Sequence, residues 1–63
     1  MKEVWVLFGI YYEEDFYECK EIISIHRHSY SAHEQKKFLE KYSKKYETYE
    51  IKCFEILDEK QQP

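Results

Sequence analysis

The 63-residue chain has little glycine, proline or cysteine: one Gly, one Pro and two Cys. With Gly9 as its single glycine, the sequence offers no glycine-rich turn to form an oxyanion-binding nest. No apolar stretch approaches the roughly 20 residues of a membrane-spanning helix. No signal peptide is expected, because the apolar N-terminal run carries Trp and Tyr and lacks a basic leader. These features predict a cytoplasmic protein with reduced thiols.

The composition is that of a small globular domain. Apolar residues make up 43% of the chain and charged residues 37%, and aromatic residues, which bury large areas at low entropic cost, make up 19%. A chain of this length buries only about 60% of the surface that its unfolded form exposes, so its stability is marginal without reinforcement. We expect one domain over residues 1–58 and a frayed tail over residues 59–63.

Charges of the two signs are separated along the sequence. The net charge is -3, but residues 32–46 hold five Lys and two Glu, so this segment carries +3 and the remainder -6. Acidic residues concentrate at positions 13–18 and 58–59. Because phosphate contacts supply most nucleic-acid affinity, an acidic chain is a poor nucleic-acid binder. A basic surface on a protein partner would suit it better.

Three segments have the residue types of β-strands. Residues 2–12 alternate and are rich in β-branched and aromatic side chains, and residues 17–28 repeat the pattern after a charged turn at 13–16. These two strands are predicted to form an antiparallel hairpin. A third strand is predicted over residues 49–57.

A helix is predicted from Ala32 to Lys45. Ser31 and Glu34 have the spacing of a capping box, in which each side chain bonds the other residue's backbone N–H. The lysines lie opposite an apolar stripe. The stripe consists of Ala32, Gln35, Phe38, Leu39, Tyr42 and Tyr46.

These elements predict an α+β fold of ββαβ order, with a three-stranded sheet and one helix packed on one face. The strand over residues 2–12 is apolar on both sides, so it should be central, which gives the strand order 2-1-3. The β-α-β crossover should be right-handed. The helix is expected to cover the face formed by Val4, Val6, Phe8, Ile10, Ile23, Ile25, Ile51 and Cys53.

The second face of the sheet is the main functional indication, because one helix can cover only one face. An apolar patch with a polar rim is typical of a protein-binding surface. We expect binding of a protein partner through this second face or through an exposed strand edge. The partner is either a foreign target or a second copy in a homodimer, and Trp5 is the expected anchor. The predicted protein-binding residues are Trp5, Leu7, Tyr11, Ile22, Phe54 and Ile56.

The same aromatic face allows a second interpretation, a module that binds single-stranded nucleic acid. Bases would stack on Trp5, Tyr11 and Phe54. That function requires a basic rim, and the sequence offers chiefly Lys20 and Lys52 among many acidic residues. Nucleic acid is therefore the less favoured partner.

Histidine and cysteine residues suggest a third interpretation, a metal-responsive domain. His26 and His28 share a strand face, and His33 follows shortly after. Three solvated imidazoles are the simpler interpretation, so no metal or other cofactor is expected. Cys19 and Cys53 are expected to be small buried apolar residues rather than nucleophiles or a disulfide. No catalytic set is apparent, and no enzyme activity is expected.

Four stretches together resemble a known kind of domain. They read V-W-V-L-F-G-I-Y-Y, I-I-S-I-H-R, S-A-H-E-Q-K-K-F-L-E-K-Y and Y-E-I-K-C-F-E-I-L. Over about residues 3–58 the chain resembles small ββαβ domains of unknown function from bacteria and their phages. The resemblance implies the fold and a phage origin, and brings no catalytic motif. With the acidic character, it suggests an inhibitor that occludes a host enzyme or defence protein in the host cytoplasm.

Overall fold

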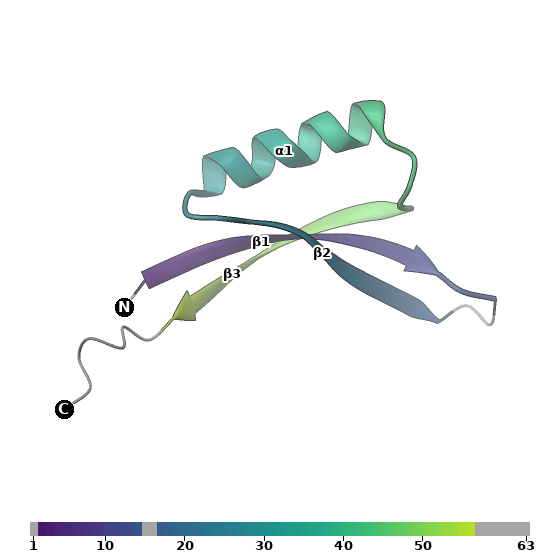
Figure 1. The fold of residues 1–63 in the computed structure, drawn as a ribbon, viewed down its shortest axis with the longest axis horizontal. Coiled ribbons are helices and arrows are strands. Elements are labelled where there is room, and N and C mark those ends of the chain that lie inside the picture. The colour runs from purple at the N-terminus through teal and green to yellow at the C-terminus, as the bar shows by residue number, and fades with distance from the viewer. Residues whose placement is uncertain (1, 15–16, 57–63) are drawn as a thin grey trace.

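The computed structural model describes residues 2–14 and 17–56. These residues form an α+β fold in which one helix lies over one face of a three-stranded sheet (Figure 1). The strand order is β2-β1-β3, and β1 pairs with both neighbours in the antiparallel direction, so the predicted fold and strand order are confirmed. The predicted tail, residues 59–63, lies outside the described residues. The elements are β1 (Lys2–Tyr12), β2 (Glu18–His26), α1 (Ser29–Tyr42) and β3 (Thr48–Ile56).

Helix α1 begins and ends three residues earlier than predicted. Its N-cap is His28, whose side chain makes no capping hydrogen bond, so the predicted capping box at Ser31 is wrong. The Ser31 hydroxyl instead donates to the carbonyl of His28 at 3.3 Å. At the other end, the backbone N–H of Ser43 donates to the carbonyl of Leu39 at 2.8 Å, and the backbone of Ser43 is extended.

The strand register determines which side chains face α1. Leu7 lies opposite Ser24 and Ile51, and Trp5 lies opposite His26 and Cys53. Residues directly opposite one another in a sheet share a face. His26 hydrogen-bonds the Ser31 hydroxyl of α1 at 2.9 Å, so this face is the one that the helix covers.

The predicted orientation of β1 is therefore wrong. Leu7 is fully buried, with 0% of its surface exposed, and Trp5 and Tyr11 alternate with it on the side of α1. Val4, Val6, Phe8 and Ile10, which were expected under the helix, lie on the other face. The cause is Gly9: the ring of Tyr46, in the link after α1, occupies the space beside it, where an ideal Cβ would lie 2.6 Å from Tyr46 Cγ.

A bulge in β2 changes the faces of two further residues. Leu7 pairs with Ser24 and Phe8 pairs with Ile22, so Ile23 is an extra residue between them. Because a bulge re-aims the residues on either side of it, Ile22 and Ile25 both lie on the face away from α1. The prediction that Ile25 packs under the helix is wrong for this reason.

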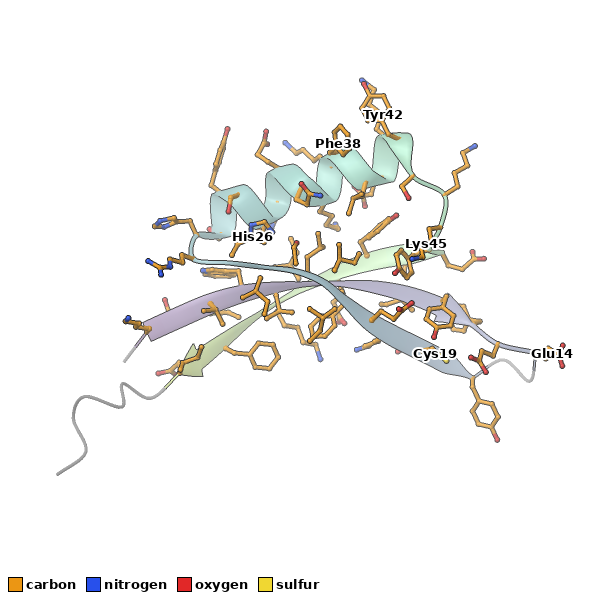
Figure 2. The ribbon with its side chains drawn as sticks, in the orientation of Figure 1. Glu14, Cys19, His26, Phe38, Tyr42 and Lys45 are labelled. Atoms are coloured by element: carbon orange, nitrogen blue, oxygen red, sulfur yellow. The ribbon has the colours of Figure 1, made fainter. Side chains whose placement is uncertain are left out.

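Helix α1 contacts the sheet through small and medium side chains. Ala32 is fully buried and Leu39 is half-buried, whereas Phe38 and Tyr42 project from the far side of the helix (Figure 2). The two rings contact each other at a tilt of 45°, with their centroids 4.9 Å apart. The predicted apolar stripe was therefore wrong for Phe38 and Tyr42. The buried apolar residues among those described are Val6, Leu7, Ile10, Ala32 and Tyr49.

Candidate functional site

The sheet face away from α1, which we call the open face, has no covering element among the described residues. It carries alternate residues of β1 and their partners on β2 and β3. Ile22 and Ile25 are each 61% exposed, and Phe54 and Ile56 are 44% and 48% exposed. The apolar residues of this face are Val4, Val6, Phe8, Ile10, Ile22, Ile25, Phe54 and Ile56.

The centre of the open face is closely packed although nothing covers it. Val6 and Ile10 are buried by their neighbours in the sheet. The rings of Phe8 and Phe54 meet edge to face with their centroids 6.4 Å apart. Such aromatic pairs contribute roughly 0.5–1.5 kcal/mol beyond the area they bury. The centre of the face is thus packed by residues of the sheet itself.

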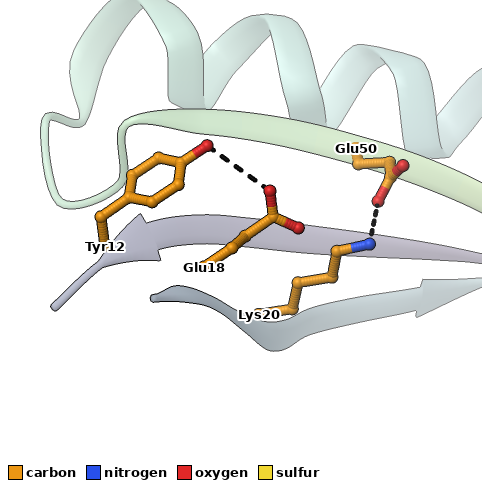
Figure 3. Close-up of polar contacts among 4 residues, drawn as sticks. All are labelled: Tyr12, Glu18, Lys20 and Glu50. Atoms are coloured by element: carbon orange, nitrogen blue, oxygen red, sulfur yellow. Dashed lines mark hydrogen bonds and ion pairs between the residues drawn. The ribbon is translucent and has the colours of Figure 1, made fainter. Parts of the chain in front are cut away.

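An ion pair crosses the open face from one edge strand to the other. Lys20 of β2 and Glu50 of β3 approach to 2.8 Å across β1 (Figure 3). The hydrogen bond from Lys20 lowers the pKa of Glu50, and the same bond raises the pKa of Lys20. Both side chains are about one-third exposed, so water screens the pair and limits its contribution. Lys20 also lies 6.0 Å from the centre of the Phe8 ring.

The two ends of the open face differ in charge. At the end where β1 begins, a hollow of about 350 Å³ is lined by Lys2, Val4, Arg27 and Ile56, together with Glu3. Lys52 is one row further along, opposite Val6. We call this region the basic end.

At the hairpin end, the surface is acidic and aromatic. A hollow of about 480 Å³ is lined by Tyr12, Glu13, Glu14 and Tyr17. Tyr12 lies opposite Glu18, and its hydroxyl donates to Glu18 Oε1 at 3.5 Å (Figure 3). We call this region the acidic end. One face therefore presents apolar residues, crossed by the Lys20–Glu50 pair, between two patches of opposite charge.

The six residues predicted to bind a protein do not form one surface. Ile22, Phe54 and Ile56 lie on the open face, whereas Trp5, Leu7 and Tyr11 lie on the side of α1. Leu7 is inaccessible, and the Tyr11 ring lies 6.2 Å from the Tyr46 ring.

Sequence reasoning missed Val4, Val6, Phe8, Ile10 and Ile25 as open-face residues. One signal was available for the four in β1: a single glycine in a central strand indicates close approach of another group on its own face. That indication places Gly9, and with it Leu7, against the covering layer. The residue types of β2 did not indicate the bulge at Ile23, which places Ile25 on the open face.

The histidines are held by hydrogen bonds to the protein itself. His26 contacts the Ser24 hydroxyl through Nε2 at 2.7 Å and the Ser31 hydroxyl through Nδ1 at 2.9 Å. With the Ser31 hydroxyl donating to the carbonyl of His28, a neutral His26 ring that carries its proton on Nδ1 satisfies both contacts. His33 Nδ1 lies 2.8 Å from the carbonyl oxygen of Ser29, to which it can donate. Within residues 2–14 and 17–56, no three His, Cys, Asp or Glu residues are grouped to hold a metal ion.

Both thiols are free and lie on opposite edge strands. Cys19 of β2 faces Tyr11, and Cys53 of β3 faces Trp5, with β1 between them. Cys19 is half-buried, and Cys53 is exposed, so the prediction that Cys53 is a buried core residue is wrong. The edge position of β3 explains its exposure.

Comparisons of the chain with protein-family models, with curated proteins and with solved structures gave no match. The resemblance to small ββαβ domains therefore stays a prediction. In the part of the chain that the structure describes, no helix has the length and apolar character to cross a membrane.

Proposed function

We propose that this chain is a protein-binding module and that the open face is its contact surface. The observation that carries the proposal is the exposure of four large apolar side chains, Ile22, Ile25, Phe54 and Ile56, on a single sheet face. Burying an exposed Ile or Phe stabilises a complex by roughly 1.5–3 kcal/mol before the costs of association. Scattered apolar residues need no explanation, but a contiguous patch on a firm sheet favours docking.

The anatomy of the face also fits a protein partner. Interfaces typically combine an apolar and aromatic centre with a polar rim. Here the Phe8–Phe54 pair is flanked by isoleucines, and charged side chains stand at both ends.

Nucleic-acid binding is less well supported than protein binding. Two of the three rings proposed for base stacking, Trp5 and Tyr11, lie on the side of α1, which leaves Phe54. Lys20, one of the two lysines expected to contact phosphate, is paired with Glu50 at 2.8 Å. The first observation removes two of the rings proposed for stacking and leaves Phe54 beside Phe8, and the second removes a proposed phosphate contact.

A narrower form of the proposal is an inhibitor that occludes a host enzyme or defence protein. It stays a prediction, motivated by the acidic chain and the resemblance described above. The open face would be its contact surface too, with the acidic end meeting a basic rim on the target.

A pair of photo-crosslinking variants tests the proposal. The photoreactive analogue benzoylphenylalanine replaces Phe54 on the open face in one variant and Phe38 on the outward side of α1 in the other. The two positions are matched, because both are phenylalanines with similar exposure, 44% and 56%. After irradiation of cells that produce each variant, mass spectrometry identifies any protein joined to the chain.

We expect protein adducts from position 54 and few or none from position 38. Adducts from position 38 alone would move the contact surface to the helix and refute the assignment to the open face. Absence of protein adducts from both positions would refute the protein-binding proposal. Nucleic-acid adducts at position 54 would favour the stacking interpretation instead.

A further inference from the structure

We propose that the occupant of the open face is a second copy of this chain, packed face to face with its strands antiparallel to those of the first. The inference rests on the proposed function and names its partner. Three observations carry it: the small core, the size of the open face, and the opposite charges at its two ends.

The core of the single chain is small. Of the five buried apolar residues, Leu7 is the one large side chain that is fully buried, and Val6 and Ile10 belong to the uncovered side of the sheet. A domain of about 60 residues is marginal even when its core is complete. A second copy is present wherever the chain is made. By covering the open face, it would stabilise the folded state of each chain.

The open face is large enough for a weak interface. Its strands contain nine to eleven residues. At about 3.3 Å per residue and about 4.8 Å between strands, the face measures about 30 Å by 14 Å. That projection is about 400 Å², within the roughly 300–600 Å² of the largest apolar patches on monomers, many of which are functional. Two such faces total about 800 Å² in projection, about half of a standard interface of about 1,600 Å², which is the size of a weak and reversible association.

The spacing of residues along β1 makes the face self-complementary. The outward residues of β1 run from Lys2 to Tyr12 and are symmetric about the position of Leu7. A two-fold axis across the strands at that position brings Val6 over Phe8 of the second copy and Val4 over its Ile10. The apolar rows therefore meet apolar rows in an isologous contact.

The same rotation brings unlike charges together at the ends of the face and along β3, whereas along β2 it brings Arg27 near Lys20, which each copy already pairs with Glu50. It sets the row of Tyr12 and Glu18 over the row of Lys2 in the second copy, so each acidic end meets a basic end. It also sets Glu50 over the second copy's Lys52, and two-fold symmetry repeats each contact. Complementary charges of this kind fix the orientation of partners more than they add affinity. The opposite orientation, with strands parallel, would set acidic ends against each other.

Sedimentation of the purified full-length chain across a wide concentration range tests the inference. We expect a reversible monomer–dimer equilibrium that Ile25→Glu shifts toward monomer, raising the dissociation constant by at least about tenfold. Phe38→Glu, a control of similar exposure on α1, should leave the dimer intact. If the circular dichroism of Ile25→Glu shows unfolding, Ile22→Glu, equally exposed on the same face, replaces it.

A charge-reversal cycle tests the antiparallel arrangement. Lys2 and Glu18 lie at opposite ends of the sheet, so they are too far apart to interact within one chain. Lys2→Glu and Glu18→Lys should each weaken the dimer, and the double variant should restore it. If the double variant weakens the dimer by the sum of the two single effects on the free energy of dissociation, the antiparallel arrangement is refuted.

Failure of the inference and failure of the proposed function are distinguishable. A wild-type chain that stays monomeric at every concentration, or a dimer that Phe38→Glu dissociates and Ile25→Glu does not, refutes the second copy as the occupant. In that case adducts of a foreign protein at position 54 would still support the protein-binding function. Assemblies that keep growing with concentration would also refute the closed dimer.

Discussion

The ring of Tyr46 packs directly against Gly9, so closely that an ideal Cβ on residue 9 would lie 2.6–2.7 Å from three ring carbons. Tyr46 follows α1 in the chain, and the neighbouring Glu47 donates its N–H to the carbonyl of Ile10 at 2.9 Å. This contact fixes the side of β1 on which the helix layer lies. The open face is the consequence, because no segment of the described residues covers the apolar side chains on the other side of β1.

Substituting Gly9 by Ala should destabilise the fold by about 1–3 kcal/mol, the usual cost of overpacking. The methyl group would displace the Tyr46 ring, which also contacts the rings of Tyr11 and Tyr49. Urea unfolding followed by circular dichroism measures the change. In a Tyr46→Ala background, Gly9→Ala should become neutral or stabilising, because glycine in a strand carries an entropic cost. An equal loss in both backgrounds would contradict the proposed contact.

Truncation to Ala should destabilise the fold strongly at Leu7 and hardly at all at Phe38. Leu7→Ala removes the large side chain that is fully buried and should cost about 2–5 kcal/mol. Phe38→Ala removes an exposed ring from α1 and should change the free energy of unfolding by no more than about 0.5 kcal/mol. Equilibrium unfolding of both variants at low protein concentration provides the comparison. A costly Phe38→Ala beside a tolerated Leu7→Ala would mean that the helix is rotated.

Tyr49→Phe should be neutral or should stabilise the protein. Tyr49 is 8% exposed, and its hydroxyl is buried without a hydrogen-bond partner among the described residues. An unpaired buried hydroxyl costs about 1–3 kcal/mol of desolvation, and the substitution removes it while keeping the ring. Tyr46→Phe is the matched control, since the Tyr46 hydroxyl donates to Glu21 at 3.3 Å. A thermal midpoint that falls for Tyr49→Phe as much as for the control would disprove this interpretation.

The Lys20–Glu50 pair should make stability depend on pH at both extremes. The pKa of Glu50 is lowered by its hydrogen bond to Lys20, so its contribution exists above the unfolded pKa of about 4.3 and disappears as pH falls through the lower folded value. The pKa of Lys20 is raised by the same bond, so its contribution exists below about 10.4 and disappears at higher pH.

Comparison of the wild type with Glu50→Gln isolates the contribution of the pair. The urea midpoint of the wild type should exceed that of the variant throughout neutral pH. The two midpoints should converge as acid protonates Glu50 and, at the other extreme, as base deprotonates Lys20. A difference that is constant from acid to alkaline pH would show that the two side chains do not interact in solution.

The order of elements followed from the sequence because hydrophobic periodicity is local. Alternation over residues 2–12 and the change of period after residue 28 were enough to predict ββαβ order and the central position of β1. The face of β1 under the helix was not predictable from periodicity, because both faces are apolar. That choice depends on a tertiary contact, the Tyr46 ring against Gly9, which only the glycine itself indicated.

The sequence predicted part of the candidate site, because residue alternation is a local signal whereas bulges and helix packing are not. Ile22, Phe54 and Ile56 were assigned to the correct face because β3 alternates more clearly and Ile22 stands among polar residues. Ile25 was misplaced because the bulge at Ile23 shifts the alternation of β2, and strand propensity does not mark a bulge. The outward position of Phe38 was missed because α1 packs on a narrow stripe through Ala32 and Leu39, and Phe38 lies about 100° around the helix from Leu39.

The most direct test of the central claim, that the open face is where a protein docks, is hydroxyl-radical footprinting of the chain alone and in complex. The complex is the one that crosslinking at position 54 identifies, whether with a second copy or with a foreign protein. On binding, oxidation should fall at Ile22, Ile25, Phe54 and Ile56 and stay unchanged at Phe38. Protection confined to Phe38 and Tyr42, with the isoleucines still oxidised, would contradict the account.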